Sequence, residues 1–387
     1  MTIAGMLLVN NPGRWSAIYP PLAHATWHGW TPTDLIFPFF VFIVGITTQL
    51  SLAARRARGD DERAIVRQVL RRGALIVLFG LLLNGFPFYT WGAVDGIADP
   101  SLVDRVVDRL YRWRIPGVLQ RIGIAYVLSA LVATRASVRA QVATTAALLV
   151  GYWFVMTQLP VPGSSGTAGK HLLDLPASTM AAWTDRVFFD WTRFGLGNHL
   201  WSSSRTWDPE GVLSTAGAVA TALLGNLAGR WLGSPRPLAE RVSALFAAGA
   251  LGAVAGLVWN WTFPINKGLW TGSYVLYTAG VACLAIATIM WLVEMRGWRG
   301  WTKPFVIYGL NPMFAFLASG VVARLTGSLI YVPWGGERLS LHAAVYQGVF
   351  APWLSPVNAS LAYAIAFVLL FFVIQTFLYR RSIVFKV

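Results

Sequence analysis

Charged residues are scarce in this chain: Asp, Glu, Lys and Arg make up only 12% of its 387 residues, whereas 56% are hydrophobic. A soluble domain usually carries about a quarter charged residues, so the composition excludes an ordinary water-soluble protein. Cysteine is nearly absent as well. The single Cys283 lies in an apolar stretch, so one chain can form neither a disulfide framework nor a cysteine-based metal site. No convincing GxGxxG, Walker, HExxH or GxSxG pattern is present.

Long apolar stretches recur along the chain, each about 18–22 residues long, which matches the roughly 30 Å hydrocarbon core of a bilayer. Such segments must be helical because their backbone polar groups find no water there. The sequence therefore predicts an all-α integral membrane protein, a single domain over residues 1–387 with about ten transmembrane helices. The predicted spans are 1–9 (partial), 33–54, 66–85, 115–134, 141–158, 211–229, 242–260, 273–293, 303–323 and 358–379.

Lysine and arginine are shared unevenly between the two sets of loops. One set holds 18 of them with few acids, and the other holds 12 with ten acids. The basic side is expected to be cytoplasmic, which places both termini in the cytoplasm. The net charge of +15 is then explained by topology rather than by nucleic acid. The basic loops are 55–72, 135–139, 230–241, 296–303 and 380–386.

Three segments depart from the pattern of simple spans. Residues 159–210 form a long outer loop, and loops of this length are usually functional. Residues 342–354 are apolar but too short to cross, so we expect a re-entrant or interfacial segment. Residues 1–9 are about half the length of a span, which predicts that the first helix is truncated.

The first polar cluster contains Asn10, His24, Trp27, His28 and Asp34. A neutral imidazole is the usual general base near neutral pH, so His24 is a candidate catalytic residue or an interfacial structural one. Asp34 either caps the following helix or orients a histidine or a cationic substrate. His28 is a candidate substrate contact. The two histidines lack a nearby third ligand, so no metal site is predicted.

Two arginines open the predicted span 115–134. Arg114 and Arg121 are seven residues apart and lie on nearly the same helix face, with Gln120 beside them. A charged residue two turns into a span is costly and is usually functional. The pair suits a phosphate or carboxylate, or it is a structural partner for Asp34 or another acid.

Two further clusters precede later spans on the outer side. Asp208 and Glu210 lie just before span 211–229, and Asn266, Lys267 and Trp270 lie just before span 273–293. Acids at a helix N-terminus complement its dipole, which explains one acid better than two. Aromatic faces beside polar groups are a common way to hold a sugar ring. These residues are therefore candidate substrate contacts.

On the cytoplasmic side, seven arginines crowd the loop 55–72, and Arg71 and Arg72 end it. These charges either serve topology and anionic-lipid contact or dock a polyphosphate group such as that of coenzyme A.

These motifs, in this order, resemble the transmembrane acyltransferases typified by heparan-α-glucosaminide N-acetyltransferase and its bacterial relatives. The resemblance extends over nearly the whole chain and is carried by residues 6–10 (MLLVN), 24–45 (HATWHGWTPTDLIFPFFVFIVG), 114–123 (RIPGVLQRIG), 208–211 (DPEG), 266–270 (NKGLW) and 379–386 (YRRSIVFK).

The resemblance implies transfer of an acetyl group from cytosolic acetyl-CoA to an amino sugar or other glycan across the membrane. His24 matches the essential histidine of the family, and Asn10 matches its partner. A bacterial-type member would be a multi-pass protein of the inner membrane. The alternative is a transporter or flippase for a sugar- or phosphate-containing substrate. A homodimer is left open.

Overall fold

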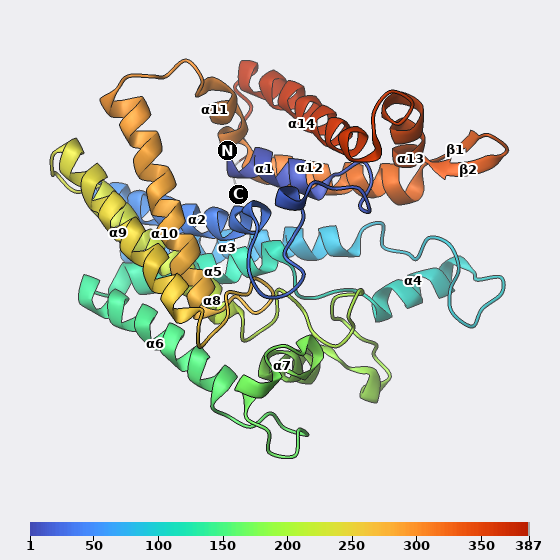
Figure 1. Cartoon of the computed structure of the whole chain (residues 1–387), viewed down its shortest axis with the longest axis horizontal. Helices are drawn as coiled ribbons and strands as arrows, with labels where there is room; N and C mark the ends of the chain where they lie inside the picture. The colour runs from blue at the N-terminus through green and yellow to red at the C-terminus, as the bar shows by residue number, and fades with distance from the viewer. Residues whose placement is uncertain (386–387) are drawn as a thin grey trace.

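The computed structural model describes residues 1–385; Lys386, which closes the C-terminal motif, lies outside them. The described residues are mostly helical, and the predicted spans coincide with helices, except that the span 303–323 is divided at Asn311 into two helices (Figure 1). These helices are α1 (Thr2–Asn10), α2 (Ile36–Ala57), α3 (Glu62–Gly85), α5 (Val118–Arg135), α6 (Val138–Thr157), α8 (Thr215–Leu232), α9 (Leu238–Trp259), α10 (Gly272–Met290), α11 (Lys303–Leu310), α12 (Pro312–Arg324) and α14 (Pro356–Arg380).

Seven helical segments of residues 1–385 are long and apolar enough to cross a bilayer. Helices α3, with 24 residues, and α8, with 18, have sufficient length but are less apolar. The prediction of an all-α membrane protein is thus confirmed, and the count of about ten spans is approximate. The seven segments are Pro32–Ala57, Val118–Arg135, Val138–Thr157, Leu238–Trp259, Gly272–Met295, Pro312–Leu329 and Pro356–Arg380.

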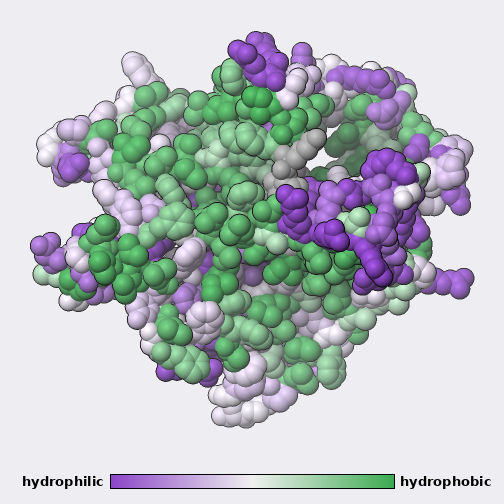
Figure 2. All heavy atoms as spheres, turned by 180° about the vertical axis from the view of Figure 1, so that it is seen from behind, coloured by the Kyte–Doolittle hydropathy of each residue, from purple (hydrophilic) through white to green (hydrophobic). Residues whose placement is uncertain are grey.

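The surface agrees with a membrane environment. Hydrophobic side chains cover much of the face seen in Figure 2, and hydrophilic ones gather in patches. Many large apolar residues are exposed on the helices, among them Leu251 on α9 and Val373 on α14. A soluble monomer rarely exposes large contiguous apolar patches, so this surface fits contact with lipid.

Glycines let the central helices approach closely. Helix α2 packs along α8, and a Cβ on Gly45 would lie 2.1 Å from the Ala222 carbonyl oxygen. A Cβ on Gly225 would meet the Phe42 carbonyl at the same distance. Small residues at such crossings are typical of membrane bundles, where close packing replaces the hydrophobic effect.

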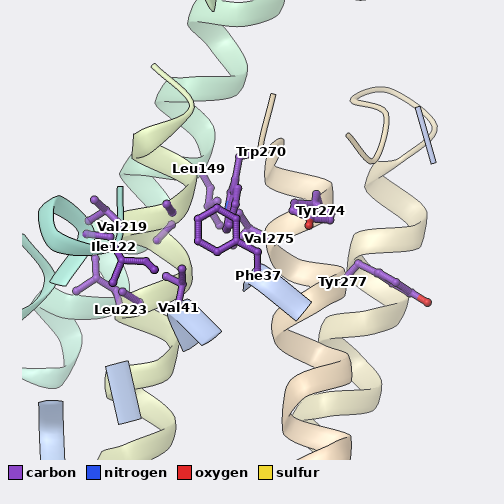
Figure 3. Packing of buried hydrophobic residues seen from close by; sticks show 14 of the residues in the cluster. Phe37, Val41, Ile122, Leu149, Val219, Leu223, Trp270, Tyr274, Val275 and Tyr277 are labelled. Carbon is purple, nitrogen blue, oxygen red and sulfur yellow. The ribbon is translucent and has the colours of Figure 1, made fainter. Parts of the chain in front are cut away.

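The largest buried cluster joins α2, α5, α8 and α10 (Figure 3). Phe37 from α2 meets the Trp270 ring edge-to-face at 4.8 Å, and Trp270 meets Tyr274 in the same way at 5.5 Å. Because these aromatic residues lock the start of α10 against the start of α2, they fix the positions of the polar residues just before both helices.

The connecting segments on the predicted outer side contain structure that the sequence did not indicate. The 159–210 loop includes α7 (Met180–Phe189), and α4 (Leu102–Tyr111) follows α3. Strands β1 (Tyr331–Trp334) and β2 (Glu337–Ser340) pair antiparallel. They lead into α13 (Leu341–Val345) and a turn through Phe350, a segment too short to cross a membrane.

Candidate active site

A cavity of about 580 Å³ lies where α1 ends, α2 and α5 begin, and the outer loop folds over them. It brings together residues from four of the polar clusters singled out in the sequence. The polar side chains on its wall are Asn10, His24, Thr26, Thr33, Asp34, Arg114, Glu210 and Lys267.

His24, Asp34 and Lys267 meet at one point of this cavity. The His24 Nδ1 atom lies 2.7 Å from Asp34 Oδ1, and the Lys267 Nζ atom lies 3.2 Å from the same oxygen and 3.0 Å from Nδ1. The Asp34 side chain is 1% exposed, whereas that of His24 is 44% exposed. The carboxylate can only accept, so the shortest contact favours a proton on Nδ1. That tautomer leaves Nε2 with a lone pair.

Asp34 performs both of the roles that the sequence allowed. Its Oδ2 atom accepts hydrogen bonds from the backbone N–H groups of Ala25 (3.0 Å) and Thr31 (3.1 Å) and caps the turn that leads into α2. Its Oδ1 atom is thereby directed at His24. The Tyr274 hydroxyl donates to the Asp34 backbone carbonyl and ties this turn to α10. The cap is therefore what holds the carboxylate in place for the imidazole.

Lys267 supplies a buried cation to this cluster. Burial lowers the pKa of the Lys267 ammonium, and attraction to Asp34 offsets this only in part. Asp34 Oδ1 thus lies beside both the Lys267 ammonium and the His24 ring.

Arg114 lies on the opposite part of the wall and is held by two acids. Its Nε donates to Asp208 Oδ2 at 2.8 Å, and its Nη2 donates to Asp208 and Glu210. Burial opposes the charge of Arg114, but the two carboxylates outweigh burial and raise the pKa of the guanidinium. Burial likewise opposes the charge of Glu210, and Arg114 reverses that effect and lowers the pKa of Glu210. Asp208 differs, because its burial outweighs its contacts with Arg114 and raises the pKa of its carboxyl.

Asp185 on α7 fixes this acidic turn, and the sequence gave no indication of that role. Its two carboxylate oxygens accept from the backbone N–H groups of Asp208 (3.1 Å) and Val212 (2.9 Å). A Cβ on Gly211 would lie 2.2 Å from Asp185, so only glycine fits there. Burial raises the pKa of Asp185 to about 7, although both N–H groups favour the ionised form. The one available signal is a lone acid inside the apolar run 180–189.

Aromatic rings form another part of the cavity wall. Trp27 and Trp201 each meet Trp207 edge-to-face, at 5.2 and 5.6 Å. The Trp27 Nε1 atom donates to the Leu173 carbonyl, which anchors the ring to the outer loop. Flat apolar faces beside hydrogen-bonding groups suit a sugar ring.

Several predicted site residues lie behind the cavity wall instead of on it. Arg121 and Trp270 are each 1% exposed, and the guanidinium carbon of Arg121 lies 5.1 Å from the Trp270 ring centroid. Arg121 also donates to Ser214 and to the Gly211 carbonyl. In this conformation both residues support the wall, and neither faces the cavity, so a ligand contact by either stays a prediction.

Asn266 and His28 also make protein contacts. Asn266 is fully buried and donates to the Trp27 carbonyl at 3.0 Å. The His28 Nε2 atom lies 2.8 Å from Asp174 Oδ1. Arg71 and Arg72 lie on α3, 14 and 13 residues from its outer end at Gly85, roughly 20 Å along the axis. They are therefore not part of the His24 cavity.

No protein-family model matches the chain. It is 28% identical over 349 residues to heparan-alpha-glucosaminide N-acetyltransferase of Mus musculus, covering 77% of this chain and 49% of that protein. It is 27% identical over 343 residues to the Homo sapiens enzyme, covering 77% and 48%. This chain is a distant relative of the heparan-alpha-glucosaminide N-acetyltransferases.

The chain spans about half the length of these curated relatives. The seven apolar helices support a multi-pass membrane protein, and both relatives bear the name of an N-acetyltransferase. Within residues 1–385, no group of three His, Cys, Asp or Glu side chains is placed to hold a metal ion.

Proposed function

We propose that this protein is a membrane-embedded acyltransferase that moves an acetyl group from acetyl-CoA to the amino group of an amino sugar or other glycan. The observation that carries the proposal is the His24 imidazole, which Asp34 holds by Nδ1 while the ring lies on the wall of a cavity. The similarity to N-acetyltransferases supports the same reaction class.

His24 acts through its Nε2 lone pair in this proposal. In direct transfer, the acceptor nitrogen attacks the thioester carbonyl, Nε2 takes the proton from that nitrogen, and the C–S bond breaks to release coenzyme A. In the covalent route, Nε2 itself attacks, coenzyme A leaves, and the acceptor amine then takes the acetyl group from the ring. Asp34 stabilises the positive charge that develops on the imidazole in both routes.

Asn10 is the candidate donor to the oxyanion. It ends α1, lines the same cavity as His24, and makes no side-chain hydrogen bond within residues 1–385. A single oxyanion donor is worth about 2.7–4 kcal/mol in other enzymes. The amide is thus free to bind the thioester oxygen as it gains charge.

The donor and acceptor enter from opposite sides in this scheme. The phosphates of acetyl-CoA rest against the cytoplasmic arginines, including Arg71 and Arg72, and the acetyl end reaches the His24 cavity beside Arg114. The acceptor approaches from the outer side, where Trp27 and its neighbours offer ring faces. The positive-inside count supports an extracytoplasmic position for this side, and the scheme assigns the protein to a bacterial inner membrane with both termini inside.

His24→Ala in the purified protein tests the proposal, with release of coenzyme A from acetyl-CoA measured in the presence of glucosamine. We expect kcat to fall by about 10²–10⁴-fold, the usual contribution of a general base. His171→Ala is the matched control, because His171 is an exposed histidine of the outer loop 159–210 and does not line the cavity. Transfer at the wild-type rate by His24→Ala would contradict the proposal. Failure of the wild-type protein to bind acetyl-CoA would favour the transporter alternative.

A further inference from the structure

A second, smaller cavity of about 280 Å³ adjoins the His24 cavity, and we call it the side chamber. It lies between the outer ends of α1, α3, α5 and α12. The two cavities share five wall residues and are therefore adjacent. The shared residues are Met6, Asn10, Arg114, Val118 and Phe316.

The side chamber differs from the His24 cavity in its charge. The larger cavity has Asp34 and Glu210 on its wall, whereas no Asp or Glu is among the residues that line the side chamber. Its ionisable wall residues are two arginines, Arg114 and Arg324, and its other polar ones are amides and a serine. Asp208 and Glu210 already neutralise Arg114. Arg324 therefore gives the chamber its net charge.

Within residues 1–385, no carboxylate lies within salt-bridge distance of Arg324. Its guanidinium donates through Nη1 to the Gly320 carbonyl of its own helix at 3.1 Å. Arg324 is the last residue of α12, at its outer end, and its side chain lines the chamber. A guanidinium with unused donors is well suited to a phosphate or carboxylate.

The simplest structural role for Arg324 would be to complement the dipole at the C-terminus of α12. The local geometry does not match that role. The helical path continues through Leu329, and the side chain bends back toward Gly320. A Cβ on Gly320 would lie 3.1 Å from Leu83 and 3.4 Å from Arg324 Nη1. The glycine thus leaves the space through which the arginine reaches the chamber wall.

We propose that the side chamber binds an oxyanion carried by the acceptor, so that the preferred acceptor is an amino sugar bearing a phosphate or carboxylate group. This inference rests on the proposed acetyl transfer. The volume corresponds to about nine water molecules at roughly 30 Å³ each, enough for one such group and its hydration. Asn10 lies on the walls of both cavities, and the inference requires an acceptor that reaches from the chamber to His24.

The experiment compares kcat/KM for glucosamine 6-phosphate and for glucosamine in the purified full-length protein with acetyl-CoA. We expect the wild-type protein to prefer the phosphorylated sugar by about 10- to 100-fold, the value of a charge-assisted hydrogen bond. Arg324→Gln should bring this ratio close to one, and Arg324→Lys should give an intermediate ratio. Arg338→Gln should leave the ratio unchanged. Arg338 is an exposed arginine of β2, so this substitution removes the same charge at a position away from the chamber.

Equal use of the two sugars by the wild-type protein would overturn the inference and leave acetyl transfer intact. If Arg324→Gln leaves the ratio of the two kcat/KM values unchanged and raises only the KM for acetyl-CoA, the chamber belongs to the donor. This result would also overturn the inference. Inorganic phosphate should compete with glucosamine 6-phosphate in the wild-type protein, a result that needs no variant. If no sugar is acetylated, the proposed function is refuted. The chamber is still supported in that case if glucosamine 6-phosphate raises the melting temperature of the wild type and of Arg338→Gln but not that of Arg324→Gln.

Discussion

Replacing Asp34 with Asn changes the imidazole while preserving the turn that holds it. The Asn side-chain oxygen can still accept from the N–H groups of Ala25 and Thr31, so the cap before α2 survives. The amide NH₂ then lies where Asp34 Oδ1 was, 2.7 Å from His24 Nδ1. Because this group donates, it favours the tautomer in which Nδ1 accepts and Nε2 carries the proton. His24 can then no longer act as a base.

The size of the effect follows from that change of tautomer. General bases contribute about 10²–10⁴-fold, and the equivalent change in serine proteases costs about 10⁴-fold through the same mechanism. We expect Asp34→Asn to lower kcat by at least about 10²-fold. The Lys267 ammonium also loses its partner at 3.2 Å. Some loss of stability is therefore expected, and thermal unfolding must be recorded beside activity.

A double-mutant cycle with His24→Gln isolates the interaction between the two residues. If Asp34 acts through His24, then Asp34→Asn should cost little activity once His24 is gone, because groups that act as a unit are strongly non-additive. Coenzyme A release with glucosamine as acceptor is measured for the wild type, both single variants and the double variant. Additive losses, or a folded Asp34→Asn protein that keeps more than about a tenth of the activity, would refute this role for Asp34.

Three further predictions concern the outer loop and the topology. The pKa of Asp185 is raised to about 7 in the folded protein, so between about pH 4 and 7 the folded state keeps a proton that the unfolded state releases. The stability of the wild type relative to Asp185→Asn should therefore fall by about 1.4 kcal/mol per pH unit over this range and stay constant above it. Thermal melts at a series of pH values measure this difference. Gly211→Ala should lower stability by about 1–3 kcal/mol and reduce activity, because its Cβ meets Asp185, whereas Gly151→Ala, with open space around it, should do neither. In a background without the native cysteine, Ser203→Cys should react with an impermeant maleimide in intact cells and Ala57→Cys only after lysis; the reverse pattern would invert the topology.

Hydropathy was enough to predict the helices because the bilayer imposes one length on every span. The span expected at 273–293 is α10 at Gly272–Met290, and the cap expected from Asp34 forms in the turn that leads into α2. The same argument placed the polar clusters, since residues just before or after spans on one side must lie at one membrane face. His24 and Asp34 were predictable for a further reason: they are ten residues apart in one short segment.

The sequence could not indicate which side of a helix faces the protein interior or a cavity. Arg121 and Trp270 lie at the correct depth, but both point into the packed core and support the wall of the cavity. The pairing of Arg114 with acids 94 and 96 residues away depends on how α5 and α8 pack together. Asp185 was missed because a loop of about 50 residues gives no periodic signal, although its contacts are as specific as those of a helix.

The outer loop completes the charge balance of the site. When His24 takes a proton or an acetyl group, one positive charge is added beside Lys267, and Asp34 alone must then serve two cations. Glu210 is the other carboxylate on the cavity wall, and it is there because Asp185 holds the backbone of the turn 208–212. Electrostatic stabilisation needs charges that are already in place. In the proposed reaction, a residue of α7 that is absent from the cavity wall would therefore act on His24 through the position of Glu210.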